Sequence, residues 1–149
     1  SYVTVPTIEK IKQSYQLREA VECQSARILA VSMTEEQRVA LMEIANELDT
    51  VPFKEKTVID SRNFHIKFHT LLTEFTGNPL LADTLRKINL FWVLCKALDT
   101  NAPKTTYPRY WHRYLVDEIA KGDPDAAEAA MRRHVNDSLV AIIAAEEQK

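Results

Sequence analysis

The sequence predicts an all-α fold, an antiparallel bundle of about six helices formed by one domain. Apolar residues recur with the period of an amphipathic helix along almost the whole chain. No segment shows the alternation of apolar and polar residues that is typical of a half-buried strand. Only two glycines occur in the 149 residues, Gly77 and Gly122, and each lies where a helical pattern ends.

The first three helices follow from the apolar period and from capping residues. The first is expected over residues 8–32. Thr34, with Gln37 three residues later, forms a capping box for a second helix that reaches Leu48. A third helix is expected over residues 56–75, and the first glycine ends it.

The last three helices are separated by equally clear signals. An Asn-Pro pair at 78–79 opens a fourth helix, since proline is tolerated in a first helical turn. This helix contains the run NLFWVLCKAL, so it is either central or part of a subunit interface. A loop near residues 100–107 leads to a fifth helix over 108–121. The second glycine ends it, and an alanine-rich sixth helix follows over 124–145.

The composition is that of an ordinary globular domain, with 46% hydrophobic and 27% charged residues. The formal net charge of −2, without runs of like charge, is a poor basis for holding nucleic acid. No apolar stretch reaches the roughly 18–20 residues of a membrane span, and no secretory signal is visible. Cys23 and Cys95 lie in apolar helical surroundings without motif spacing, so we interpret them as free thiols rather than a disulfide. These features predict a cytoplasmic domain that does not contact a membrane.

All four histidines are expected to face the core. His65, Phe68 and His69 follow the spacing of one helical face, so both imidazoles share the apolar stripe of the third helix. His112 and His134 hold the corresponding positions on the fifth and sixth helices. If about a third of helical positions face inward, chance places all four there on the order of one time in a hundred.

A bound metal is a better explanation of four inward histidines than four separate hydrogen bonds. A single one would be interpreted as a core histidine with a hydrogen-bond partner, but each unsatisfied imidazole costs roughly 1–3 kcal/mol. A divalent ion gives one partner to all of them, and histidines from several helices are a recurrent metal site in bundles. We therefore predict a metal site, with zinc favoured and nickel or another transition metal as alternatives. Its ligands would be His65, His69, His112 and His134.

Several stretches carry a family resemblance. They are YQLREAVE (15–22), FHTLLTEFTGNPLL (68–81), KGD (121–123) and DAAEAAMRRHV (125–135). Together they resemble the FadR-type C-terminal (FCD) domain of GntR-family transcription regulators. The resemblance implies an all-helical ligand-binding and dimerisation domain, here over residues 8–149, that holds a divalent metal through one Asp and three His. In the family motif Asp-x-x-Phe-His, His69 matches the histidine, and His112 and His134, 22 positions apart, match the other two.

The chain departs from this pattern at one ligand. The position of the family's aspartate holds His65, so we expect a site of four histidines. Asp60 lies five residues earlier, about 140° around the helix, and cannot substitute directly. Four neutral imidazoles leave a divalent ion at +2, where one Asp and three His would leave +1. The site is therefore expected to favour an anionic ligand and metals that prefer imidazole.

The resemblance also implies a function and partners. The chain would sense a small carboxylate or hydroxy acid at the metal, as a homodimer. DNA would be contacted only through an N-terminal winged-helix domain missing from this chain, of which residues 1–7 would be the remnant of the linker and wing. Arg18 is the candidate effector-binding residue, because a planar guanidinium can donate to both oxygens of a carboxylate. Pairing of Arg18 with Glu22 one turn away is the equally weighted alternative.

Two other classes of protein would also use this arrangement. A metal-dependent hydrolase or thiol transferase would need a general base near the metal. The inward neighbours of the histidines are apolar, and Glu22 is the only carboxylate that is a candidate for such a base. We therefore do not expect an enzyme. A structural metal in an interaction domain would instead form a closed site without exchangeable water.

Overall fold

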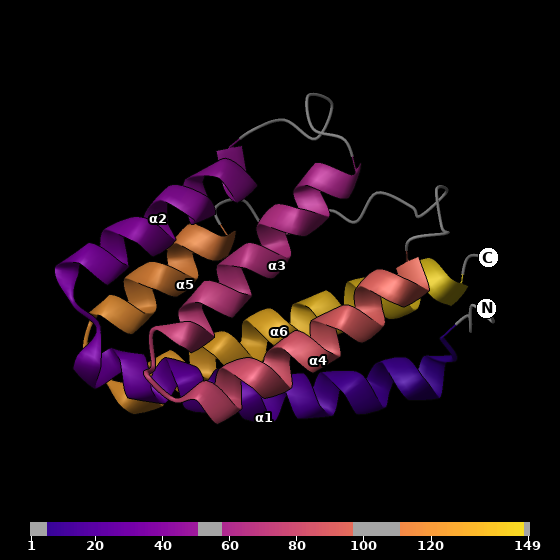
Figure 1. The fold of residues 1–149 in the computed structure, drawn as a ribbon, viewed down its shortest axis with the longest axis horizontal. Coiled ribbons are helices and arrows are strands. Elements are labelled where there is room, and N and C mark those ends of the chain that lie inside the picture. The colour runs from indigo at the N-terminus through magenta and orange to yellow at the C-terminus, as the bar shows by residue number, and fades with distance from the viewer. Residues whose placement is uncertain (1–5, 51–57, 97–110, 148–149) are drawn as a thin grey trace.

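The computed structural model describes residues 6–50, 58–96 and 111–147, with side chains described except at 58–63 and 90–96. These residues form six helices and no strand (Figure 1). The helices are α1 (Ile8–Ser32), α2 (Glu35–Thr50), α3 (Val58–Glu74), α4 (Pro79–Lys96), α5 (Trp111–Ala120) and α6 (Pro124–Glu147). The predicted all-α fold is confirmed, and the described helix ends lie within a few residues of the predicted ones. The expected loop at 100–107 and the expected helix starts at 56 and 108 lie outside the described residues.

Consecutive helices run in opposite directions, as expected for an antiparallel bundle (Figure 1). The long helices α1 and α6 lie side by side, and α1 also contacts α3, α4 and α5. Helix α2 packs on α3 and α5 at the other side of the bundle. None of the described helices combines the length and hydropathy that crossing a bilayer demands.

The capping residues identified in the sequence act as predicted. Gln37 N donates to Thr34 Oγ1 at 3.1 Å while Thr34 N donates to Gln37 Oε1 at 3.0 Å, which is a reciprocal capping box before α2. Asn78 Oδ1 accepts from the backbone of the first turn of α4 at 3.0 Å. Asp123 Oδ1 does the same for α6, also at 3.0 Å. These side chains satisfy backbone donors that a helix start leaves without an intrahelical partner.

Both glycines end their helices in the left-handed region. Gly77 has φ of 73° after α3, and Gly122 has φ of 83° after α5. L-residues with a Cβ rarely adopt this conformation, so glycine is the residue that lets the chain turn immediately after each helix. The two turns set the antiparallel return of α4 against α3 and of α6 against α5.

The main core lies between α1, α2, α3, α5 and α6. Its large side chains that are exposed by 1% or less are Ile11, Leu29, Leu41, Phe68, Leu72, Leu115, Ile119 and Met131. A smaller cluster joins Val21 of α1 to Leu85 and Ile88 of α4. Leu80, at the start of α4, is 75% exposed, so the described part of this helix buries only one face. The side chains of residues 90–96, including Cys95, lie outside the described part of the chain. The interface role expected for the run NLFWVLCKAL therefore stays a prediction.

Candidate metal centre

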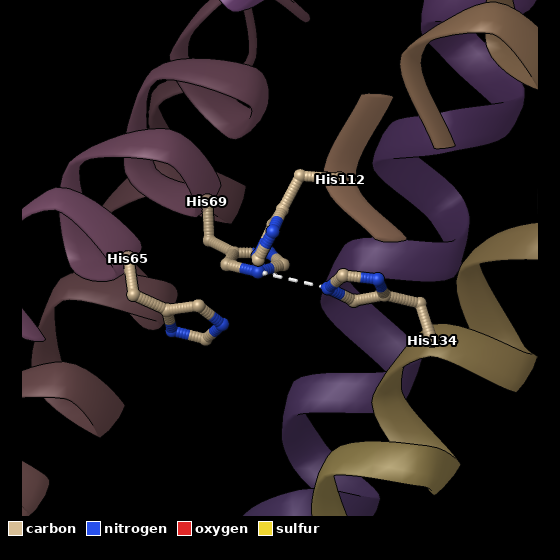
Figure 2. Close-up of side chains that lie close together, drawn as sticks. All are labelled: His65, His69, His112 and His134. Carbon is tan, nitrogen blue, oxygen red and sulfur yellow. Dashed lines mark hydrogen bonds between the residues drawn. The ribbon is translucent and has the colours of Figure 1, made fainter. Parts of the chain in front are cut away.

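The four histidines converge in the interior of the bundle (Figure 2). His65 and His69 come from α3, His112 from α5 and His134 from α6. One ring nitrogen of each lies within 4.8 Å of the corresponding nitrogens of the others. His69, His112 and His134 are exposed by 2%, 5% and 3%, and His65 is half-buried at the edge of the cluster. The structure thus brings together all four histidines that the sequence singled out, although the first and the last are 69 positions apart in the chain.

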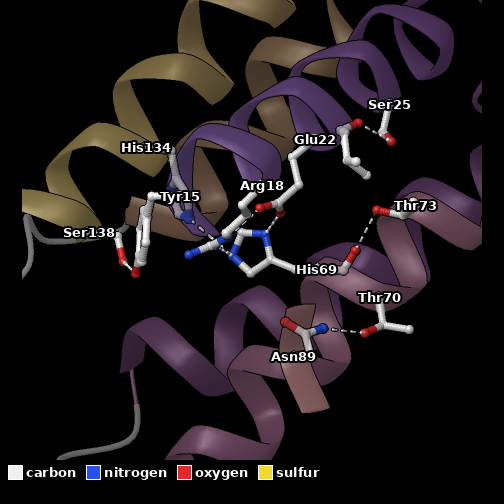
Figure 3. A network of polar contacts seen from close by, with 11 residues as sticks. Tyr15, Arg18, Glu22, Ser25, His69, Thr70, Thr73, Asn89, His134 and Ser138 are labelled. Atoms are coloured by element: carbon white, nitrogen blue, oxygen red, sulfur yellow. Dashed lines mark hydrogen bonds and ion pairs between the residues drawn. The ribbon is translucent and has the colours of Figure 1, made fainter. Parts of the chain in front are cut away.

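His69 lies at the centre of this arrangement and its ring is held in one tautomer. Its Nδ1 donates to the Oε1 of Glu22, a carboxylate of α1 that is 0% exposed (Figure 3). Because a carboxylate only accepts, Nδ1 carries the proton and Nε2 keeps its lone pair. Arg18 Nη2 and His134 Nε2 each lie 3.2 Å from that Nε2. Since a guanidinium only donates, His69 Nε2 accepts from Arg18, and its lone pair would have to leave that contact in order to bind a metal.

His112 is held in the same way by a different helix. Its Nδ1 is 2.8 Å from Oδ1 of Asp49, at the end of α2. Burial works to raise the pKa of Asp49, but hydrogen bonds from the His112 ring and from the backbone of Arg113 lower it overall. The carboxyl group is therefore ionised at neutral pH and accepts the Nδ1 proton. The other nitrogen of His112, Nε2, is buried and has no hydrogen-bond partner within the described parts of the chain.

His134 completes the cluster from α6. The indole of Trp111 stacks on its ring, with 3.6 Å between centroids and 21° between planes. Its Nε2 points to His69, while its Nδ1 is buried without a hydrogen-bond partner among residues 6–50, 64–89 and 111–147. The aromatic stack fixes the plane of the ring without using either nitrogen, so Nε2 can contact His69 while Nδ1 has no partner among these residues.

The residues present fit a divalent transition metal. Nitrogen ligands at a bond length of about 2.0–2.1 Å lie roughly 3–4 Å apart around one ion. Here the four nitrogens lie within 4.8 Å of one another, and those of His69 and His134 are separated by 3.2 Å. The donor set consists of imidazole alone, which suits zinc, nickel or copper better than calcium or magnesium.

The structure shows the Arg18–Glu22 pairing, one of the two interpretations that the sequence left open for Arg18. Arg18 Nε donates to Glu22 Oε2, so the pairing within α1 is present, and its Nη2 also reaches the histidine cluster. The guanidinium carbon lies 5.2 Å from the centroid of the Tyr15 ring, within the range of a cation–π contact. Burial works to raise the pKa of Glu22, but the charge of Arg18 and the contact with His69 bring it down to about 2. Glu22 is therefore an ionised partner of both side chains.

The three buried imidazoles are neutral at neutral pH. Burial lowers the pKa of His69 to about 4, although Glu22 opposes the shift. Burial likewise lowers the pKa of His112, and it lowers that of His134 well below its ordinary value. The neutral imidazole is the form that can donate a lone pair to a metal, so these rings have the protonation state that coordination would require.

Acid is expected to destabilise the metal-free chain. The free energy of unfolding should fall as pH drops from 6.5 to about 4, because unfolded histidines bind protons across this window and buried His69 does not. Each imidazole that stays neutral in the fold contributes a slope of about 1 kcal/mol per pH unit. Glu22 adds a loss of the same sign at lower pH, between 4.5 and about 2.

Urea unfolding at several pH values with a chelator measures the slope. His69→Gln should make it shallower, and an unchanged slope would contradict the assignment.

Two residues at the site carry no signal in the sequence. Asp49 is 63 positions from His112, and Trp111 stacks on a ring of another helix. Neither contact follows a helical period or a motif, so only the tertiary packing reveals them. The side chain of Asp60, whose position on the helix argues against a role as ligand, lies outside the described residues.

By fold and by site, the chain is an all-helical binding domain with a polar centre enclosed by α1, α3, α5 and α6. The family model of the FCD domain matches residues 13–137, and the chain therefore belongs to the FCD family, the C-terminal effector-binding domains of FadR-type regulators in the GntR family. The predicted resemblance is confirmed. The family and its relatives indicate a regulatory, non-enzymatic role for the domain, as expected from the sequence.

Similar proteins carry matching descriptions. The chain is 27% identical over 139 residues to the HTH-type transcriptional repressor RspR of Escherichia coli K12, covering 92% of this chain and 60% of that protein. The uncharacterized HTH-type regulator YdfH of Shigella flexneri matches to the same extent. The HTH-type transcriptional repressor NanR of Salmonella newport is 28% identical over 125 residues, which cover 81% of this chain and 46% of NanR. The chain thus spans between about half and three fifths of the length of these relatives.

Proposed function

We propose that the domain senses a small carboxylate or hydroxy acid bound at a divalent metal, with zinc the favoured ion and nickel an alternative. His65, His69, His112 and His134 would hold the metal. The observation that supports this most directly is the gathering of four imidazole nitrogens within 4.8 Å of one another in the bundle interior. The metal would supply positive charge that binds carboxylate oxygens, and four neutral imidazoles leave that charge undiminished.

Arg18 is the residue proposed to orient the effector. The residue is 6% exposed, and its guanidinium is anchored to Glu22 through Nε and lies 3.2 Å from His69 Nε2 through Nη2. A guanidinium fixed on one side by a carboxylate presents its remaining donors in a defined direction, which suits a planar anion. The buried pair is neutral overall, so Arg18 contributes geometry more than net charge.

In the whole regulator, the domain would act as part of a homodimer in the cytoplasm. Residues 8–149 would form the ligand-binding and dimerisation unit, and residues 1–7 would belong to the linker that follows a winged-helix DNA-binding domain. The relatives are named HTH-type regulators and are longer than this chain, which supports that arrangement. Effector binding would alter DNA binding only if the effector has different affinities for two helix packings.

Thermal unfolding of the zinc-loaded chain with a panel of small acids tests the proposal. Lactate, malate, citrate and gluconate are suitable probes, and at least one is expected to raise Tm. At a concentration of about 100 times Kd the stabilisation is about 2.7 kcal/mol. A chelator should abolish the shift, and Arg18→Lys should weaken it while the zinc content stays unchanged. If zinc itself raises Tm but no acid does so further, the metal is structural and the sensing role fails.

A further inference from the structure

We infer that Asp49 is a positioning residue of the metal centre, which fixes the ring of His112 and ties it to the first turn of α5. The inference rests on the metal-binding function proposed above. It concerns a carboxylate of α2, a helix that contributes none of the four imidazoles.

The contacts of Asp49 show how one side chain serves both purposes. Its Oδ1 lies 2.8 Å from Nδ1 of His112 and 3.2 Å from the backbone nitrogen of the same residue. Its Oδ2 accepts from the backbone nitrogen of Arg113 at 2.8 Å. The side chain is 3% exposed, so water competes little for these bonds. Asp49 therefore binds the ring of His112 and the start of the helix that carries it.

These contacts have a chemical consequence for the ring. The carboxylate can only accept, so the proton resides on Nδ1 and the lone pair on Nε2. Nε2 of His112 is the buried nitrogen without a hydrogen-bond partner in the described part of the chain. A carboxylate behind a ligating histidine fixes its tautomer and orientation and makes the ligand nitrogen more basic. Because the backbone bonds also fix Asp49, the ring cannot turn without disturbing the first turn of α5.

Charge gives Asp49 a role that Glu22 does not share. Both carboxylates contact a cluster histidine, but Glu22 is neutralised by Arg18. Among the described residues no lysine or arginine forms an ion pair with Asp49, and His112 is its charged-pair partner only if protonated. Asp49 therefore brings net negative charge into contact with a cluster of neutral rings, where it favours a bound cation.

Zinc affinity of Asp49→Asn, measured by competition with a chromophoric chelator, tests the inference. Asparagine keeps one acceptor oxygen but has no charge, and the expected loss of affinity is about 10–100-fold. Asp123→Asn is the matched control, because Asp123 caps α6 through its Oδ1 and contacts no histidine among the described residues. The control should keep the zinc affinity of the wild type within about twofold.

A spectroscopic measurement separates positioning from a general loss of stability. The visible absorption bands of the Co²⁺-loaded chain report the ligand set, so they should shift in Asp49→Asn and stay unchanged in Asp123→Asn. In the background of His112→Gln, adding Asp49→Asn should cause little further loss of zinc affinity, because Asp49 acts through that ring.

The outcomes distinguish this inference from the proposed function. A wild-type chain that binds no zinc overturns both. A wild type that binds zinc, with Asp49→Asn equal to it in affinity and in Co²⁺ spectrum, overturns only the role of Asp49. If Asp49→Asn does not fold, Asp49→Glu takes its place in both measurements, zinc affinity and Co²⁺ spectrum. Glutamate keeps the charge but displaces it by one methylene group. A loss of at least severalfold then supports the inference, and affinity within about twofold overturns it.

Discussion

Replacing His69 by alanine is expected to remove the metal from the chain. The wild type, purified without an affinity tag, should contain about one zinc or nickel ion per chain, and the variant should contain almost none. His69 has the most constrained ring of the four, with Nδ1 bound to Glu22 and Nε2 directed at His134. Its ring centroid lies 4.6 Å from that of His65 and 5.1 Å from that of His134. Elemental analysis of both proteins measures the difference.

The same substitution should remove the stabilisation that the metal provides. At a free metal concentration of about 1,000 times Kd, binding adds about 4 kcal/mol to the free energy of unfolding, and the variant should gain nothing. Phe68→Leu is the control, because Phe68 is the adjacent core residue, is 0% exposed and offers no ligand atom. It should lower stability and keep the metal. A well-folded wild type that resists loading would reduce the histidines to core residues and refute the effector mechanism.

Replacing Glu22 by leucine is expected to cost about 3–5 kcal/mol of unfolding free energy in the metal-free chain. Glu22 is 0% exposed, and Arg18 is 6% exposed and pairs with it. Without the carboxylate, the guanidinium is a buried charge with no compensating anion, and His69 loses the acceptor of its Nδ1 proton. Urea unfolding in the presence of a chelator measures the loss.

The double variant Arg18→Met, Glu22→Leu provides the decisive comparison. Since it removes both charges together, it should recover most of the stability that the single change loses. Glu35→Gln disrupts an exposed pair with Arg38 and should change stability little. If Glu22→Leu costs less than about 1 kcal/mol, or if the double variant is no better than the single one, the buried pair does not have the role described here.

Local signals explain why most of the fold could be predicted from the sequence. Gly77, Gly122, the Thr34–Gln37 box and the residues Asn78 and Asp123 each act within a few positions of the chain, and the structure confirms all of them. The inward direction of the histidines follows from the same helical period. Such signals depend on the backbone geometry of one helix, which the sequence specifies directly.

The surroundings of the site depend on tertiary packing and were less predictable. The sequence offered Arg18 as either an effector anchor or a partner of Glu22, and the structure shows one side chain that contacts both Glu22 and the cluster. It could not show that Glu22 would reach His69, 47 positions away, or that Asp49 would reach His112. These contacts join helices whose relative placement is decided by the packing of the whole core.

The placement of the cluster has a consequence for how a signal could leave it. Helices α3, α5 and α6 supply the rings, and α1 and α2 supply the carboxylates that hold two of them. Five of the six described helices thus supply either a histidine of the cluster or a side chain that contacts one, and α4 contacts α1 and α3. A change of occupancy at the cluster would act on three of these helices through their histidines and on α1 and α2 through one further hydrogen bond each, so its effect would reach all five within two side chains.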